Sequence, residues 1–372
     1  MTETQRVRDL TTAQRQLPIE VEGSVAYELI LTMWSVFNPG ESNTAFDLGK
    51  KWQNQVRDAT PSDLQDEIKA LGGAHCGLWL AIAALLITAP HPHDPTNVFN
   101  WLASIDHQRL LRWLLSVVGH QEDAALVERA ATGDIEAVEE LLGEKAAGKP
   151  EFLEQLTAIV RTEDLPKRYA DVLIRFREEV FSEYEEAFGG AIARAAAARR
   201  AVASRGDARS VVEEATAGID FDIPLGVTRV ILIPSVVTRP LSLIDGPYRG
   251  ALLVYYAIAD EFMDSDPEAP PSWLLRTYKA LSDERRLRIL RRLSEGETSL
   301  DELTDMLGLS KSTVHHHISI LRGAGLIRVR IGSGHDEGGK RKCYALREQS
   351  LLDATGLLDS YLRIEEAGAK HA

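Results

Sequence analysis

The sequence has little of what disulfide, metal-thiolate or membrane-spanning structures need. Its 372 residues include only two cysteines, Cys76 and Cys343. Two cysteines this far apart make neither a disulfide framework nor a metal-ligand cluster, so we expect a reducing compartment. No cationic leader precedes an apolar run, and the longest such run, residues 76–88, is shorter than the about 17 residues of a membrane span. We therefore expect a cytoplasmic protein with no membrane partner and a buried helix at this run.

Motifs of common catalytic sites are also missing. The chain contains no H-E-x-x-H and no G-x-S-x-G, and neither cysteine has an activating partner nearby in sequence. Residues 334–341 match G-x-x-x-x-G-K, but Arg341 stands where a phosphate-binding loop has Ser or Thr, and no helix is expected after it. We therefore expect no catalytic residues, no enzyme activity and no cofactor. His91, His93 and Asp94 could chelate a metal, but we interpret them as a polar loop.

What the sequence does contain is a pattern of two short helices joined by a tight turn, over residues 299–326. Apolar residues recur at helical spacing as far as Leu307, and Gly308 supplies the turn. Ser310 is a suitable N-cap for a second helix, which ends near Gly323. This spacing predicts a helix-turn-helix.

The predicted second helix has two unlike faces. Val314, Ile318 and Leu321 share one face and must pack inward, whereas the opposite face is short, polar or cationic. Such a face suits a DNA major groove, where donors and acceptors read base edges. Adjacent helical residues point about 100° apart, so residues 315–317, all histidine, cannot converge on one metal ion, and His317 should be partly packed. The predicted DNA contacts of this helix are Ser310, Lys311, Ser312, Thr313, His315, His316, Ser319 and Arg322.

Basic residues continue into a predicted hairpin, with strands at residues 327–331 and 341–346. The whole chain has a net charge of −14, yet residues 311–347 carry eight basic and two acidic residues, a local charge of +6. Screening acts over about 10 Å at 0.1 M salt, so the local charge decides phosphate contact. The predicted phosphate contacts of the hairpin are Arg328, Arg330, Lys340, Arg341 and Lys342.

From Tyr278 to Arg347 the sequence resembles the winged helix-turn-helix of the arsenical-resistance-repressor (ArsR) family. The motifs D-x-x-R-L-x-I-L, G-L-S-x-S-T-V, H-H and L-R-x-A-G-L occur here in order. The resemblance implies a transcriptional repressor that binds double-stranded DNA as a homodimer. In the family the first and last helices of the domain form the dimer interface. Two departures matter: family members usually carry Ser where His315 stands, and residues 300–306 lack the Cys pair of metal-sensing members. We therefore transfer no base preference and expect no metal site.

The remaining pattern predicts a mainly α protein with small β elements. We divide it into a flexible arm (1–20), a helical regulatory domain that ends in short strands (21–259), an acidic proline-rich linker (260–271) and a winged domain (272–372). Predicted helices of the regulatory domain cover residues 24–37, 45–59, 61–71, 77–88, 96–105, 109–118, 134–144, 150–161 and 165–204, the last with a break at Gly189-Gly190. Predicted strands cover residues 228–234, 235–239 and 250–256, separated by Pro240 and residues 245–247.

The long first domain also suggests how the protein is controlled. A winged domain binds DNA unaided, so we expect a small organic ligand or a partner protein to act through the other 250 or so residues. Apolar helices bearing Trp34, Trp79, Trp101 and Trp113 could line a pocket for it. The alternative is a ligand-binding or enzymatic helical domain with a fused winged helix used for protein interaction.

Overall fold

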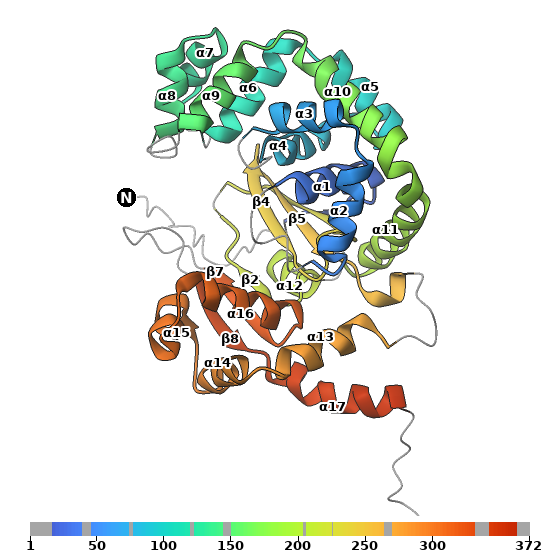
Figure 1. Cartoon of the computed structure of the whole chain (residues 1–372), viewed down its shortest axis with the longest axis vertical. Helices are drawn as coiled ribbons and strands as arrows, with labels where there is room; N and C mark the ends of the chain where they lie inside the picture. The colour runs from blue at the N-terminus through green and yellow to red at the C-terminus, as the bar shows by residue number, and fades with distance from the viewer. Residues whose placement is uncertain are drawn as a thin grey trace, which may run out of the picture.

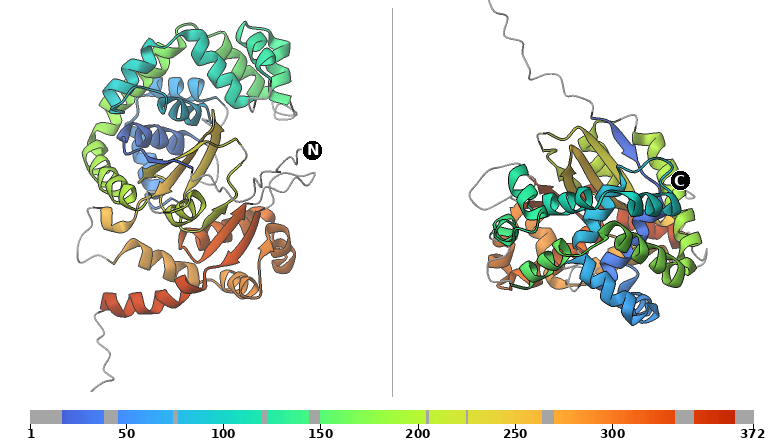
Figure 2. Two further views of the ribbon diagram at one scale, coloured as in Figure 1. Left: turned by 180° about the vertical axis from the view of Figure 1, so that it is seen from behind. Right: turned by 90° about the horizontal axis from the view of Figure 1, so that it is seen from above.

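The computed structural model describes residues 17–38, 46–73, 77–119, 123–143, 150–203, 206–224, 226–263, 270–331 and 342–362. The chain is mainly helical with two four-stranded sheets, which confirms the predicted fold class. In Figure 1 the helical domain lies above the winged domain, and Figure 2 shows the same arrangement from behind and from above.

Helices α5 to α11 form an arc around α1 to α4 and the central strands (Figure 1). Aspartate N-caps begin five helices of this domain, α5, α6, α7, α8 and α12. Two eight-residue helices, α7 and α12, were not predicted, although Asp123 and Asp207 mark where they begin. The helices of this domain are α1 (Val25–Phe37), α2 (Gly49–Ala59), α3 (Ser62–Gly72), α4 (Gly77–Leu86), α5 (Pro95–Ser104), α6 (His107–Val118), α7 (Ala124–Ala131), α8 (Ile135–Leu142), α9 (Pro150–Val160), α10 (Leu165–Phe176), α11 (Ser182–Ala203) and α12 (Ala208–Ala215).

The long helix predicted over residues 165–204 has its irregularity elsewhere than expected. Gly189 and Gly190 lie inside the regular helix α11, so the predicted break there is wrong. The helix instead widens into a π segment at η4 (Arg177–Phe181). The wider turn shifts the register of the helix face, and both Val180 and Phe181 are buried in consecutive positions.

The predicted short strands form one mixed sheet in the order β1-β3-β5-β4. Its members are β1 (Ile19–Val21), β3 (Arg229–Ser235), β4 (Leu243–Tyr248) and β5 (Ala251–Ala257). The strands β1, β3 and β5 run parallel to one another, and β4 is antiparallel to β5. Three expectations are corrected: the end of the predicted arm is a strand, residues 236–240 are a turn, and residues 245–247 lie within β4 at a register shift.

Both faces of this sheet are covered, which explains the continuous apolar runs of β3 and β5. Ile231 and Ile233 face the large core formed with α1 and its neighbours. Val230 and Leu232 face a second core that contains α12. The helix α12 thus lies between the sheet and the winged domain (Figure 1).

The winged domain contains the predicted helix-turn-helix, hairpin strands and flanking helices, together with the short strand β6, which was not predicted. They are α13 (Ser272–Leu281), α14 (Glu284–Ser294), β6 (Thr298–Ser299), α15 (Leu300–Leu307), α16 (Lys311–Gly323), β7 (Ile327–Ile331), β8 (Lys342–Leu346) and α17 (Glu348–Leu362). Its sheet has the order β2-β7-β8-β6, with β7 and β8 antiparallel. The unpredicted strand β2 (Ile219–Phe221) comes from the helical domain and runs parallel to β7. The helical domain therefore supplies one strand of the winged sheet.

A buried ion pair reinforces this shared strand. Asp220 of β2 is 4% exposed and accepts hydrogen bonds from Arg209 of α12 and from Arg330 of β7, the latter at 3.1 Å. Burial alone would raise the pKa of the Asp220 carboxyl, but the two guanidinium groups hold it below its ordinary value. Asp220 therefore ties both domains together as a carboxylate.

The apolar run at residues 76–88 gives α4, whose residues are largely buried, as expected. Among the described residues no single helix has the length and apolar composition to cross a membrane. Taken together, α3 and α4 have the length and apolar composition of a membrane span. The two helices are bent by 79° at a break that includes residues outside the described part.

Glu28 of α1 holds the chain that follows β3. It is 0% exposed, and its Oε1 accepts hydrogen bonds from the amides of Val236 at 2.9 Å and Val237 at 2.7 Å. Among the residues that the structure describes, its Oε2 has no hydrogen-bond partner. Burial raises the pKa of Glu28 to about 7, although these amides favour the ionised form.

This carboxyl predicts a particular pH dependence of stability. Because the folded pKa of about 7 lies above the unfolded value of about 4.5, the wild type should lose stability as the pH rises between these values, by up to about 3 kcal/mol. Glu28→Gln keeps an oxygen acceptor but does not titrate. Its melting temperature relative to the wild type should therefore rise from about pH 5 to about pH 8. A difference that stays constant with pH would contradict this role.

Candidate nucleic-acid interface

The two helices of the helix-turn-helix are each fixed by a side-chain cap. At the start of α15 the Ser299 amide donates to Glu302 Oε2 at 2.8 Å, and the Glu302 amide donates to Ser299 Oγ at 3.3 Å. Gly308 ends α15 at φ 63°, a conformation that favours glycine. Ser310 then caps α16 by accepting from the Thr313 amide at 3.3 Å. The predicted turn and N-cap are thus present.

The inward face of α16 is the predicted one. Val314 and Leu321 are fully buried and Ile318 is 2% exposed, in the core of the winged domain. This packing determines which side of α16 is left outside. His317 also packs inward and is 6% exposed, as expected.

The outward face gathers the predicted polar contacts at the start of α16. Ser310, Lys311, Ser312, His315 and His316 are exposed. Lys311 Nζ lies 2.6 Å from Asp301 of α15, but both side chains are more than two-thirds exposed. A pair so open to water contributes little to the stability of the fold, so a phosphate can replace the carboxylate.

Two further predicted residues lie at the edges of this face and are half-buried. The hydroxyl of Thr313 lies 2.8 Å from Ser310 Oγ, so it supports the cap. Ser319 is one turn further along the helix than His315.

The histidines differ in their surroundings. Partial desolvation and then the positive charges of Arg322 and Lys342 lower the pKa of His315, so its imidazole is neutral at pH 7. Neither ring nitrogen of His317 has a hydrogen-bond partner within the described part of the chain. The rings of His316 and His317 are 6.2 Å apart and inclined by 57°. The three side chains therefore point to different surroundings rather than to one ion.

Arg322 lies apart from the other predicted contacts. Desolvation lowers the pKa of its guanidinium, and its buried Nε finds no hydrogen-bond partner among the described residues. It is half-buried and lies near Tyr344 of β8. Helical spacing alone distinguishes a half-buried position of α16 poorly from an exposed one, which is why the sequence grouped Arg322 with the surface residues.

The arginines of the wing strand are half-exposed, and each faces a carboxylate. Arg330 Nη1 lies 3.1 Å from Glu297, and Arg328 Nη2 lies 3.9 Å from the same residue. Lys342 at the start of β8 is exposed. The predicted contacts Lys340 and Arg341, with the G-x-x-x-x-G-K segment, lie outside the described residues.

Comparison with known proteins places this domain. Residues 283–329 match the family described as "Bacterial regulatory protein, arsR family". The HTH-type transcriptional regulators CmtR of Mycobacterium bovis and Mycobacterium tuberculosis are each 37% identical over 91 residues, which is 24% of this chain and 72% of the relative. The chain belongs to the arsR family. The transcriptional activator HlyU of Vibrio cholerae is 44% identical over 52 residues, 14% of this chain and 48% of HlyU. The arsR-family domain makes the chain a DNA-binding regulator.

The helical domain contains two groups of residues that the sequence suggested as possible ligand sites, a histidine-carboxylate group and four tryptophans. Glu22, His91 and His93 offer ligand atoms within 4.8 Å of one another. However, His93 Nδ1 lies 2.6 Å from Glu22 and Nε2 lies 2.9 Å from the Ala89 carbonyl, so both ring nitrogens already have protein partners. Asp94, which the sequence grouped with the histidines, caps α5 instead.

The tryptophans considered as pocket walls are mostly core residues of the helical domain. Trp79 is 0% exposed and Trp113 is 3% exposed, and their indole N–H groups donate to the carbonyls of Ile68 and Ala81. Trp34 is buried too, and Trp101 is half-buried. These contacts satisfy the polar edges of the two buried indoles and explain them as packing residues.

Two groups of variants separate reading of bases from anchoring on phosphates. Ser312→Ala and His316→Ala on the exposed face of α16 should each remove about 1 to 3 kcal/mol of discrimination between operator and unrelated DNA. Arg328→Ala and Lys342→Ala should weaken both DNAs alike and lessen the salt dependence. Competition binding with the two DNAs measures this. If the wing variants change the preferred DNA sequence more than the α16 variants do, then the wing reads the bases and α16 anchors the protein on phosphates.

His315 predicts a pH dependence of DNA binding. Its pKa is lowered in the free protein and should rise beside phosphates, so binding should take up a proton and tighten as the pH falls below neutrality. Fluorescence anisotropy at constant ionic strength measures the affinity at each pH. His315→Gln should flatten the dependence, while His107→Gln on α6 serves as a distant control that should not.

Proposed function

We propose that this protein is a sequence-specific transcriptional repressor that binds double-stranded DNA as a homodimer and is controlled through its helical domain by an effector. The observation that carries the proposal is the exposed, capped and polar start of α16 in an arsR-family domain. Side chains of this kind can donate to and accept from base edges. DNA as the partner also favours a cytoplasmic location.

Exposed apolar side chains support the homodimer. Leu275 of α13 is 44% exposed, and Leu352 and Leu362 of α17 are 68% and 52% exposed. These two helices contact each other within the winged domain (Figure 1), and both carry exposed leucines. An apolar surface of this kind is what a second copy would cover.

Repression follows from size. A dimer of 372-residue chains carries two helical domains beside its DNA-binding units and would occlude a promoter that overlaps the operator. HlyU is named an activator, so the sign of regulation needs its own test. A reporter gene behind the operator should be less active in the presence of the protein, and increased activity would exclude repression.

The helical domain is placed to transmit a signal because it shares a strand with the winged sheet. A ligand changes DNA affinity only through its different affinities for the DNA-competent and incompetent states, typically by about 1 to 3 kcal/mol. A domain that pairs directly with β7 has a physical route for such a difference.

The dimer predicts the form of the operator and the stoichiometry. Footprinting of the full-length protein on genomic DNA should find inverted repeats with half-sites about one helical turn apart, each repeat binding two chains. The logarithm of affinity should fall with that of salt by about 0.9 per phosphate neutralised. One chain per repeat at saturation would exclude the dimer.

Charged substitutions test the surface. Leu275→Glu combined with Leu362→Glu should yield monomers in sedimentation and weaken operator binding at least about tenfold, because two half-sites are no longer bound together. Leu287→Glu on α14 is the matched control: Leu287 is 48% exposed but lies outside the α13–α17 surface, and the variant should remain dimeric.

A further inference from the structure

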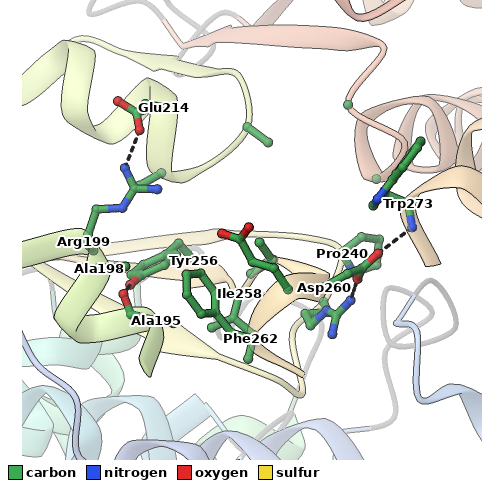
Figure 3. A pocket seen from close by; sticks show the side chains of 18 of the residues that line it. Ala195, Ala198, Arg199, Glu214, Pro240, Tyr256, Ile258, Asp260, Phe262 and Trp273 are labelled. Carbon is green, nitrogen blue, oxygen red and sulfur yellow. Dashed lines mark hydrogen bonds and ion pairs between the residues drawn. The ribbon is translucent and has the colours of Figure 1, made fainter. Parts of the chain in front are cut away.

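A cavity of about 470 Å³ lies where the helical and winged domains meet. One side is formed by α11, α12 and the chain after β5, and the other by α13 and the end of α16. Figure 3 shows Arg199, Tyr256 and Phe262 on the first side and Trp273 across from them. This volume is in the range of pockets that bind small molecules.

The position of the cavity in the fold is one that binds ligands in other α/β sheets. The parallel strands β3 and β5 end at Ser235 and Ala257. The segments that follow them, with Pro240 and residues 258–262, line the cavity. Ligands of open α/β sheets bind outside the carboxyl ends of the strands. The cavity therefore has a structural reason to be a site.

The charged side chains that line the cavity indicate which charge a ligand should carry. Its three arginines are each paired: Arg199 with Glu214 at 2.8 Å, Arg239 with Asp260, and Arg276 with Asp47 at 2.6 Å. Glu261 is exposed and has no ion-pair or hydrogen-bond partner among the described residues. The one unpaired charge of the described lining is therefore negative, and a cation would satisfy it.

The apolar part of the lining points to the rest of the ligand. Tyr256, Phe262 and Trp273 contribute three aromatic rings, and Phe262 and Trp273 are only half-buried. The guanidinium carbon of Arg199 already lies 5.6 Å from the Tyr256 ring centre, so the site tolerates a cation over an aromatic face. Aromatic rings beside one carboxylate are the usual surroundings of organic cations in proteins.

We propose that this cavity binds an organic cation with an apolar or aromatic body and is the effector site of the regulator. The proposal deepens the proposed function, because it rests on control through the helical domain. Glu261 neutralises the cation, and Phe262 and Trp273 contact its body.

The walls of the site explain how binding reaches DNA. Gly323, the last residue of α16, packs so closely on Pro240 that an added Cβ would lie 2.7 Å from Pro240 Cγ. At the other wall the Trp273 amide donates to Asp260 at 2.7 Å, which ties the start of α13 to the chain after β5. A molecule between these contacts touches both domains, so its affinity depends on their spacing.

The test uses two probes of the same shape and opposite charge, tetraphenylphosphonium and tetraphenylborate, with the full-length protein. Calorimetry should show tetraphenylphosphonium binding with one site per chain and tetraphenylborate binding at least about tenfold more weakly. Glu261→Gln should weaken the cation at least about tenfold, and Glu261→Asp should retain most of the affinity. Glu163→Gln, an exposed carboxylate between α9 and α10, should change nothing.

The same probe is then added to the operator complex. Tetraphenylphosphonium should change operator affinity at least about fivefold in the wild type and in Glu163→Gln but not in Glu261→Gln. The proposal is overturned if the cation does not bind or if both probes bind equally well. It is also overturned if Glu261→Gln binds the cation as tightly as the wild type, or if the cation leaves operator affinity unchanged. If the protein without probe binds no operator, the proposed function fails instead, and the calorimetric result stands by itself.

Discussion

The pairing of β2 with β7 is the constraint on which the arrangement of the two domains depends. β2 ends at Phe221 and β3 begins at Arg229, so one short connection links the winged sheet to the central sheet of the helical domain. The Val329 amide donates to the Gly218 carbonyl at 2.9 Å, and the Asp222 amide donates to the Ile331 carbonyl at 3.3 Å. Joined only by a linker, the domains would be free to separate. With this ladder in place, separation must break main-chain hydrogen bonds or carry β2 away from its own domain.

The same strand brings negative charge to the wing. Arg330 faces both Asp220, which is buried, and Glu297, and Arg328 faces Glu297. If these arginines contact DNA as proposed, its phosphates must compete with carboxylates of the protein for them. Asp220 also binds Arg209 of α12, so one buried carboxylate is shared between α12 and Arg330 of the wing strand. In an acidic chain, control of the wing by local carboxylates matters more than the net charge of −14.

The sequence predicts the winged domain well because each of its signals is local. Ser299, Gly308 and Ser310 set the helix ends through contacts a few residues away, and apolar spacing gives the inward face of α16. It fails where the deciding contact is distant. β2 has three residues and no alternation, and only its partner β7 makes it a strand. Arg322 is half-buried near Tyr344 of β8, and the cavity is assembled from segments between Ala195 and Gly325, so no single window of sequence contains either arrangement.

Because α16 contributes both to the proposed DNA surface and to the lining of the cavity, the two proposed sites would be coupled. The helix has 13 residues and is about 20 Å long, with its polar N-terminal turn on the DNA side and Gly323 against Pro240. A packed helix moves as a rigid body, so a displacement at Gly323 tilts the exposed residues at the other end. Such coupling would also be reciprocal. The distance between the two domains that DNA binding favours would be the distance at which a ligand meets the cavity. Whether a ligand releases or strengthens DNA binding is thus decided by which spacing fits it better, a property of its size as well as its charge.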